Sequence, residues 1–265
     1  MINFKIRRVL AILMRQTKAL LNFFEISNHL YWVLFDIITF GFLTKSLGQT
    51  GNDTDIMILL SNLAIWYIVP RGAIFIALPL LKDLSDLSFI GLMSTPLSIS
   101  EWLVAQIIMG VIGSILSFFM VFFSVKIFFG YNVFTMLGWL IIPSAALSLF
   151  SSWIIGIIIL AILLMVGKKA MMTIYPLASL SVLFSGVFYP METMSLFVQK
   201  ISHFVPMSYI FDFLRKYFKN GEITFLPFLK SFGLNIIYFI IALAIFLIVL
   251  KQRKKIGLTS LEAEA

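Results

Sequence analysis

The residues that could carry chemistry in this sequence lie inside long apolar stretches. Asp36 stands in the run YWVLFDIITFGF, and Arg71 follows Pro70 in the middle of the next apolar run. If these runs span a membrane, a charged group at such a depth is costly unless it has a partner or touches water. Because the two runs would form consecutive antiparallel helices, we predict that Asp36 and Arg71 form an ion pair, directly or through water. The alternative is that Arg71 extends to the interface, or faces the bundle interior, with no relation to Asp36.

The sequence lacks the common catalytic and metal-binding motifs. It has no cysteine, and its two histidines, His29 and His203, are far apart and have no metal-ligand neighbour. Each histidine is predicted to be an interfacial polar residue. The phosphate loop G-x-x-x-x-G-K-[ST] and the nucleophile motif G-x-S-x-G are both absent from the sequence. We therefore expect no catalytic, cofactor or metal site, no ATP hydrolysis by this chain, and no enzyme activity of its own.

The composition is that of an integral membrane protein. Hydrophobic residues make up 61% of the chain and charged residues 12%, and the mean hydropathy is +1.04. A soluble domain is about 25% charged. The 265 residues suit about six spans joined by short loops, which predicts a single all-α membrane domain over residues 1–265. The predicted spans are residues 28–47, 56–81, 101–124, 138–166, 170–188 and 228–250.

Two amphipathic segments accompany these spans. In residues 1–27, apolar side chains recur at three- and four-residue spacing with cations between them, which predicts a helix lying on an anionic leaflet; the alternative is a solvated helical tail. Residues 189–219 are aromatic and charged and are broken by prolines, which predicts a re-entrant hairpin of short helices in the outer leaflet. The candidate outer gate comprises Phe188, Tyr189, Pro190, Pro206 and Tyr209. The alternative for these aromatics is interfacial anchoring.

The distribution of basic residues predicts the topology. Of the 20 lysines and arginines, twelve fall on segments assigned to the inside and seven on segments assigned to the outside, while Arg71 lies within a span. Because cytoplasmic loops carry the excess of cations, both termini are predicted to be cytoplasmic in a cell membrane, either plasma or inner. The net charge of +8 is therefore first a topology signal, and nucleic acid is not expected among the partners.

The segment from Asp83 to Glu101 is short and half polar, and it lies between two apolar runs on the predicted cytoplasmic side. Its apolar residues argue against an ordinary solvated loop, which is the alternative. We predict a coupling helix over residues 83–96 that a partner protein moves. Pro96 would end it, and Ser98 or Ser100 would cap the next helix. The predicted coupling residues are Asp83, Leu84, Asp86, Leu87, Ile90, Leu92, Thr95 and Pro96.

Three motifs follow one another along the chain. The first span contains W-x-x-x-D-x-x-x-x-G-F, the cytoplasmic segment contains L-x-x-T-P-L-x-x-x-E, and the outer hairpin contains G-V-F-Y-P and then P-x-[ST]-Y. Their residues are Trp32, Asp36, Gly41, Phe42, Leu92, Thr95, Pro96, Leu97, Glu101, Gly186, Val187, Phe188, Tyr189, Pro190, Pro206, Ser208 and Tyr209. In this order, and over nearly the whole chain, they resemble the ABC-2 type permeases, which are the membrane subunits of type-2 ABC exporters. The cytoplasmic segment departs from the family pattern in having fewer charges before Gly91.

The resemblance implies two permease subunits in the lipid bilayer, as a homodimer or a related heterodimer, working with ABC ATP-binding subunits that hold ATP and Mg²⁺. Closure of the ATPases would move the coupling helix and open a cavity outward. The cargo is expected to be a hydrophobic or amphiphilic drug, antibiotic or lipid-like molecule; the alternative is a lipid-linked glycan. A secondary carrier would show more intramembrane acids or internal repeats. That carrier and a non-catalytic membrane scaffold are the rival classes.

Overall fold

The computed structural model describes residues 5–20, 22–47 and 53–256, and these residues form helices and connecting turns without a strand. Within them, five helical stretches are long and apolar enough to cross a membrane. The stretches are Ile26–Ser46, Thr54–Ser85, Ile99–Phe129, Val133–Val166 and Leu226–Lys255. The chain is therefore a multi-pass membrane protein, and five of the six predicted spans have a counterpart.

Two of the predicted spans are built from several helices. The crossing expected at 56–81 consists of α3 (Asp53–Trp66) and α4 (Ile68–Ser85), which meet at Tyr67. Pro70 explains the break, because it has no N–H to donate to the carbonyl of Trp66 four residues earlier. The crossing expected at 138–166 consists of α7 (Val133–Leu137), the 3₁₀ turn η1 (Gly138–Leu140) and α8 (Ile141–Val166).

The remaining long helices are continuous: α2 (Phe23–Leu47), α6 (Ile99–Phe129) and α13 (Leu226–Ile256). Both α6 and α13 extend beyond the predicted limits of 101–124 and 228–250. At the start of α6, Ser98 forms a capping box with Glu101. The predicted cap at Ser98 is thus confirmed, and it places the beginning of the helix two residues before the expected position.

The span expected at 170–188 is not among the five long stretches. After the turn η2 (Gly167–Ala170), the chain forms only α9 (Met171–Ser179) and α10 (Ser181–Ser185). Pro176 lies inside α9, and Gly186 ends α10 in the left-handed conformation with φ 71°. At about 1.5 Å per residue these two helices extend over about 20–25 Å, less than the apolar thickness of a bilayer.

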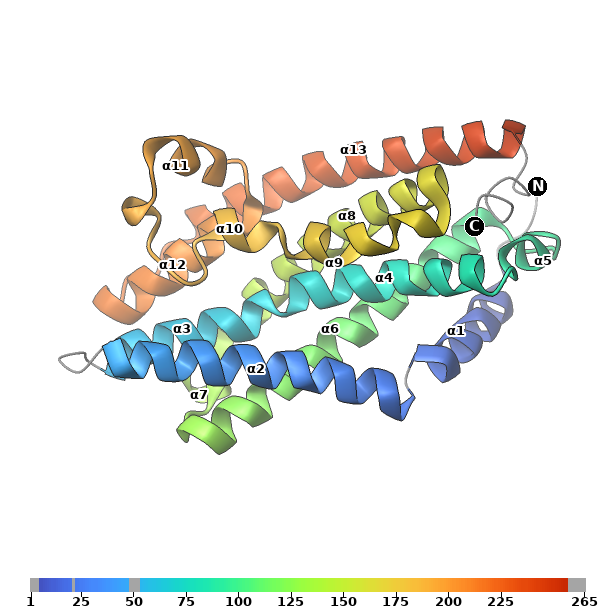
Figure 1. Ribbon diagram of the computed structural model, residues 1–265. Helices are drawn as coiled ribbons and strands as arrows, with labels where there is room; N and C mark the ends of the chain where they lie inside the picture. The colour runs from blue at the N-terminus through green and yellow to red at the C-terminus, as the bar shows by residue number, and fades with distance from the viewer. Residues whose placement is uncertain (1–4, 21, 48–52, 257–265) are drawn as a thin grey trace.

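The two predicted amphipathic segments are helical. The N-terminal one forms α1 (Ile6–Leu20), while residues 1–4 and 21 of the expected 1–27 lie outside the described residues. The expected hairpin at 189–219 forms η3 (Met191–Thr193), α11 (Leu196–Ser202) and α12 (Pro206–Asn220). Figure 1 shows α1 and the short helix α5 (Phe89–Met93) at one end of the bundle, and α7, α11 and α12 towards the other.

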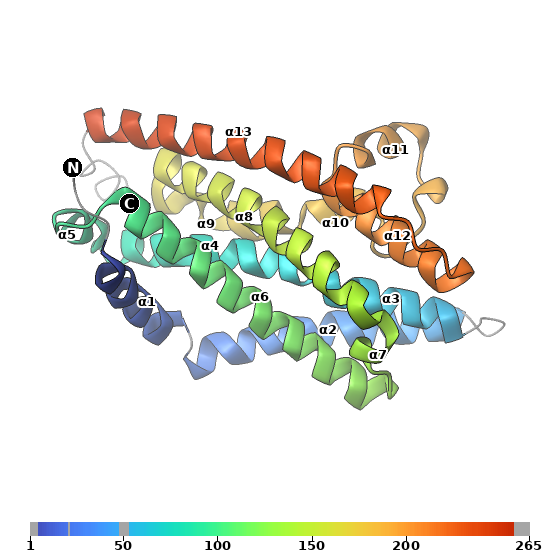
Figure 2. The same cartoon turned by 180° about the vertical axis from the view of Figure 1, so that it is seen from behind.

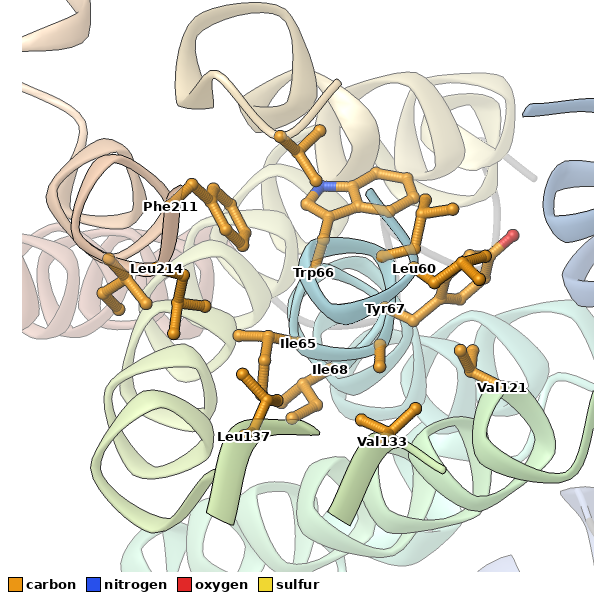
Figure 3. Packing of buried hydrophobic residues seen from close by; sticks show 14 of the residues in the cluster. Leu60, Ile65, Trp66, Tyr67, Ile68, Val121, Val133, Leu137, Phe211 and Leu214 are labelled. Atoms are coloured by element: carbon orange, nitrogen blue, oxygen red, sulfur yellow. The ribbon is translucent and has the colours of Figure 1, made fainter. Parts of the chain in front are cut away.

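The α3–α4 crossing forms the centre of the bundle. In the apolar window of Thr54–Ser85, 89% of the residues are buried, against 22% for α2 and 28% for α13. Helix α4 packs against α6, α8 and α9. In Figure 1, α2 and α9 lie on its near side, and in Figure 2, seen from behind, α6 and α8 lie in front of it. Figure 3 shows side chains of α3, α6, α7 and α12 converging in the core, among them Trp66, Val121 and Phe211.

Small residues allow the central helices to approach closely. A Cβ added at Gly72 of α4 would lie 2.2 Å from Ser114 Oγ of α6 and 2.4 Å from Ser152 Oγ of α8. Gly110 and Gly113 of α6 likewise leave no room for a side chain beside α4. The small residues of α6 therefore let it pack closely against α4, as small residues do between helices of membrane proteins.

Candidate functional site

The predicted coupling segment contains the end of α4 and the five-residue helix α5. Helix α4 continues to Ser85, and the backbone then reverses at Leu87, whose φ of 54° is unusual for a residue with a side chain. Ser88 begins the short helix and Ser94 ends it. Thr95 and Pro96 lead to the capping box of α6. The predicted coupling helix over residues 83–96 is therefore divided between α4 and α5, and Ser94, not Pro96, ends the short helix.

The predicted coupling residues divide into an exposed and an internal group. Leu87 is 57% exposed, and Asp86, Thr95 and Pro96 are exposed beside it. Ile90 and Leu92 are half-buried. Asp83 and Leu84 are buried in the last turn of α4, because that turn is covered by neighbouring parts of the chain. The surface that a partner could touch therefore runs from Asp86 to Pro96 and does not include Asp83 or Leu84.

Asp83 joins α4 to the amphipathic helix α1. Arg15 of α1 forms an ion pair with Asp83, and its guanidinium also donates to Ser88 Oγ at 3.1 Å. Ser88 Oγ lies 3.2 Å from Asp83 Oδ1, to which it donates. Nearby, Lys82 Nζ donates to the carbonyl of Ala19 at the end of α1 at 3.0 Å. These contacts hold α1 against the start of the coupling segment.

Glu101 joins α1 to the other end of the same segment. Its carboxylate is completely buried and accepts hydrogen bonds from the backbone N–H of Ser98 at 2.8 Å and of Lys5 at 2.6 Å. Arg8 Nη1 lies 3.5 Å from Glu101 Oε2 in an ion pair. Helix α1 is therefore attached both where α4 ends and where α6 begins, so it should move together with the coupling segment.

A buried amide network extends this attachment into the bundle. With its amide oriented to satisfy its neighbours, Gln106 of α6 donates to the carbonyl of Ile76 at 3.0 Å and accepts from Gln16 of α1 at 2.6 Å and from Trp102 at 3.2 Å. Gln16 and Gln106 were not singled out in the sequence. The sequence did contain a signal, because each is a polar amide among apolar residues of its helix. A buried amide needs hydrogen-bond partners, so such a residue indicates a polar contact between helices.

Asp36 and Arg71 lie on either side of Tyr67. The Tyr67 hydroxyl donates to Asp36 and lies 3.1 Å from the carbonyl oxygen of Trp32. The Arg71 guanidinium lies over the Tyr67 ring, 5.7 Å from its centre. Among the residues that the structure describes, no direct ion pair joins Asp36 to Arg71. Tyr67 thus separates the two charges that the sequence brings to consecutive crossings.

His29 is buried beside this group. Ser117 Oγ donates to the carbonyl of Gly113 at 2.7 Å, so its single hydrogen is committed there. At 2.5 Å from Ser117 Oγ, His29 Nε2 is therefore the donor in that contact. The His29 ring also meets Phe75 edge-on at 5.6 Å. His29 therefore connects α2 to α4 and α6 inside the bundle, whereas the exposed His203 ends α11.

The predicted gate residues contact different parts of the bundle. Phe188 packs against Phe40 of α2, with ring centres 4.3 Å apart, and against Trp66 of α3. Tyr209 of α12 donates to the carbonyl of His203 at 2.9 Å and lies under Lys230 of α13. Of the remaining three gate candidates, Tyr189 is exposed and Pro190 is half-buried. Pro206 is buried and is the first residue of α12.

A buried arginine holds the turn before the hairpin. Arg215 of α12 donates to the carbonyl of Gly186 at 2.9 Å, and Asn62 of α3 donates to the carbonyl of Val187 at 3.3 Å. Burial lowers the pKa of the Arg215 guanidinium from its usual value, and Asp212 and Glu192 oppose that shift. The turn is therefore tied to both α3 and α12, which sequence reasoning did not foresee.

Three cavities along the described part of the bundle are apolar and have volumes of about 120 Å³ or more. One of about 220 Å³ is bordered by α4, α8, α10, α12 and α13, with Asn235 and Tyr238 among its lining residues. Another of about 120 Å³ lies among α4, α6 and α8. A third, open one of about 520 Å³ lies between α10 and the start of the hairpin. A fourth, smaller cavity contains Arg71 and His29.

Comparison with known proteins identifies a family whose model matches most of the chain. A family model described as ABC-2 type transporter matches residues 7–219. That range includes all of α1 but its first residue, the coupling segment and the hairpin at 189–219. A search of curated proteins finds no match to this sequence.

Proposed function

Because the chain belongs to the family of ABC-2 type transporters, we propose that it is the permease of an ATP-driven exporter whose ATP-binding subunit docks on the surface from Asp86 to Pro96. A permease of this family normally works in a membrane with such a subunit. One observation supports the proposal most directly. The exposed segment from Asp86 to Pro96 is bound to α1 near both of its ends, through Asp83 and through Glu101. A partner that pushes on α5 moves α4, α6 and α1 with it.

The transmitted movement follows from the contacts of the segment. Phe89 of α5 is buried and meets Trp102 of α6 edge-on at 6.3 Å. Trp102 in turn stacks with Phe246 of α13 at 6.3 Å. Because packed cores change between discrete arrangements rather than deform continuously, a displacement of α5 would reposition these helices together. Exposed Leu87 and Asp86 would be the points that the ATP-binding subunit touches.

The topology of the proposal keeps both termini in the cytoplasm. The basic side chains of α1, of Lys82 and of the last turn of α13 gather at the end of the bundle that contains α5, and an excess of cations marks the cytoplasmic side. Helices α9 and α10, followed by the hairpin, would complete a sixth crossing. This arrangement would place the hairpin at the outer surface, where Phe188 and Tyr209 could act in a gate.

A second copy of the chain, or a related subunit, would complete the transport pathway. The apolar faces of α2 and α13 carry many exposed large side chains, among them Phe35, Phe42, Ile237 and Ile241. Such faces suit lipid or another helix. The cargo would be a hydrophobic or amphiphilic molecule, as the apolar cavities of the bundle favour. A lipid-linked glycan is the alternative within the same class.

The test is transport in vesicles that contain this chain and the ATP-binding protein that purifies with it. We expect ATP-dependent movement of a hydrophobic dye, and a marked decrease with Asp86→Lys. The matched control is Glu222→Lys, which reverses an exposed acid just after the C-terminal cap of α12 and should leave transport unchanged. Transport that a proton gradient drives without any ATPase would contradict the proposal and favour a secondary carrier.

A further inference from the structure

The cavity at Arg71 differs chemically from the three apolar ones. It is lined by Asn28 and His29 of α2, by Arg71 of α4 and by Tyr175 of α9, together with apolar residues of α4. The linings of the three apolar cavities contain no charged side chain. At about 20 Å³ it has room for about one water-sized group. It could therefore receive an oxygen of a larger molecule, but not the whole molecule.

The guanidinium at this cavity lacks a carboxylate partner within the described chain. Tyr67 takes the hydrogen bond of Asp36, and the Arg71 side chain lies over the Tyr67 ring instead of reaching the acid. Arginine stays ionised and has five N–H donors, which it arranges as a planar fork. That fork matches the two oxygens of a carboxylate or a phosphate. A half-buried arginine in a membrane protein therefore favours an anion that arrives from outside the chain.

The depth of the cavity suits an amphiphile in the inner leaflet. Asn28 lies in the second turn of α2 and Tyr175 in the second turn of α9. At about 1.5 Å per residue, Asn28 is about 8 Å and Tyr175 about 6 Å from the start of its helix. In the proposed topology, α2 and α9 start on the cytoplasmic side, whereas α4 ends there. Arg71 is about 21 Å from the cytoplasmic end of α4, near the middle of the crossing. Because Asn28 is nearer to the start of α2 than to its end, a headgroup from the inner leaflet would have the shorter path to Arg71.

An aromatic stripe continues from the cavity along α2. Tyr31, Trp32 and Phe35 follow Asn28 by three, four and seven residues, so all of them lie on one side of α2. All three are exposed, at 59%, 46% and 48%, and they pack against one another. An apolar chain attached to an anionic group at Arg71 would lie along this stripe. The pair of features therefore fits a molecule with an acidic head and an apolar tail.

We infer that this cavity binds the phosphate or carboxylate group of an anionic amphiphile taken from the inner leaflet, with the aromatic stripe of α2 holding its apolar part. The inference rests on the proposed function and narrows its cargo to acidic amphiphiles. Arg71 would pair with the acidic group, and Asn28 would add a neutral hydrogen-bonding group beside it. Neutral amphiphiles would lack the charge-assisted contact and would bind more weakly.

The test measures binding to the purified chain, without ATP or an ATP-binding subunit. Native mass spectrometry in a neutral detergent would compare dodecyl phosphate with dodecanol as the matched neutral probe. We expect Arg71→Gln to weaken dodecyl phosphate binding by about tenfold or more, as expected for loss of a hydrogen bond to a charged group, with dodecanol binding unchanged. Arg71→Lys should restore part of the affinity. Lys251→Gln, which removes an exposed cation at the end of α13, is the matched control and should have no effect.

A second variant keeps the test decisive if Arg71→Gln does not fold. Asn28→Asp is nearly isosteric and places a carboxylate in the cavity, so it should occupy Arg71 and weaken dodecyl phosphate binding to a similar extent. Equal affinity in wild type and in these variants, or an equal loss in Lys251→Gln, would overturn the inference. Inorganic phosphate should not displace dodecyl phosphate; displacement at equal concentration would assign the site to free anions instead. Failure of ATP-driven transport would appear only in the vesicle assay, so the two failures remain distinct.

Discussion

The attachment of α1 to the coupling segment predicts a measurable coupling energy between Arg15 and Asp83. Arg15 is 43% exposed in its side chain and Asp83 only 7%. Exposed ion pairs contribute about 0–1 kcal/mol, whereas breaking a buried pair costs about 3–5 kcal/mol. A pair with one exposed and one buried partner should lie between these values, at about 2 kcal/mol.

A double-mutant cycle with Arg15→Gln, Asp83→Asn and both together isolates this energy. We expect Arg15→Gln to be the more destabilising single change, because it leaves the buried Asp83 with Ser88 as its side-chain partner. Asp83→Asn instead leaves a guanidinium that reaches water. Unfolding of the purified protein in graded sodium dodecyl sulfate, followed by circular dichroism, gives the free energies. Single effects that add to within about 0.5 kcal/mol would refute the attachment.

Two further substitutions separate stability from coupling. Leu87→Gly should raise the free energy of unfolding by about 1 kcal/mol, because glycine adopts positive φ without strain. The same change should lower cargo-stimulated ATP hydrolysis, because the exposed side chain is lost. Reduced thermal stability of Leu87→Gly would contradict the strain argument. Gly72→Ala should destabilise the protein by about 1–3 kcal/mol through overlap with Ser114 and Ser152, as thermal unfolding would measure. Gly233→Ala, where a Cβ would meet nothing within 4 Å, is the control; an equal loss there would remove the packing explanation.

Local patterns in the sequence were sufficient for most of the helices. Apolar runs of about 20 residues predict crossings because a bilayer demands that length. Five of these runs form long helical stretches, two of which consist of more than one helix. The capping box at Ser98 was also readable, because it needs only residues three positions apart. In the run at 170–188, α9 ends at Ser179 and Gly186 ends α10, so this apolar stretch forms two short helices instead of one long one.

Contacts between distant segments could not be read from those patterns. Asp83 follows an apolar run and reads as a surface residue, but Arg15, 68 positions earlier, covers it. The place of Tyr67 between Asp36 and Arg71 was partly accessible, because Tyr67 and Arg71 are four residues apart and share a side of their crossing. The sequence alone does not predict how far α2 is shifted along the bundle relative to α3 and α4, because that shift depends on packing along the whole bundle.

The central claim is that an ATP-binding subunit contacts the surface from Asp86 to Pro96. A photoreactive amino acid at Leu87, compared with one at Ile127, tests it most directly, because the two residues are 57% and 75% exposed and Ile127 lies near the opposite end of α6. We predict that the ATP-binding subunit crosslinks at position 87 and not at position 127, and that ATP changes the yield at position 87. Crosslinking at position 127 without crosslinking at position 87 would contradict the account.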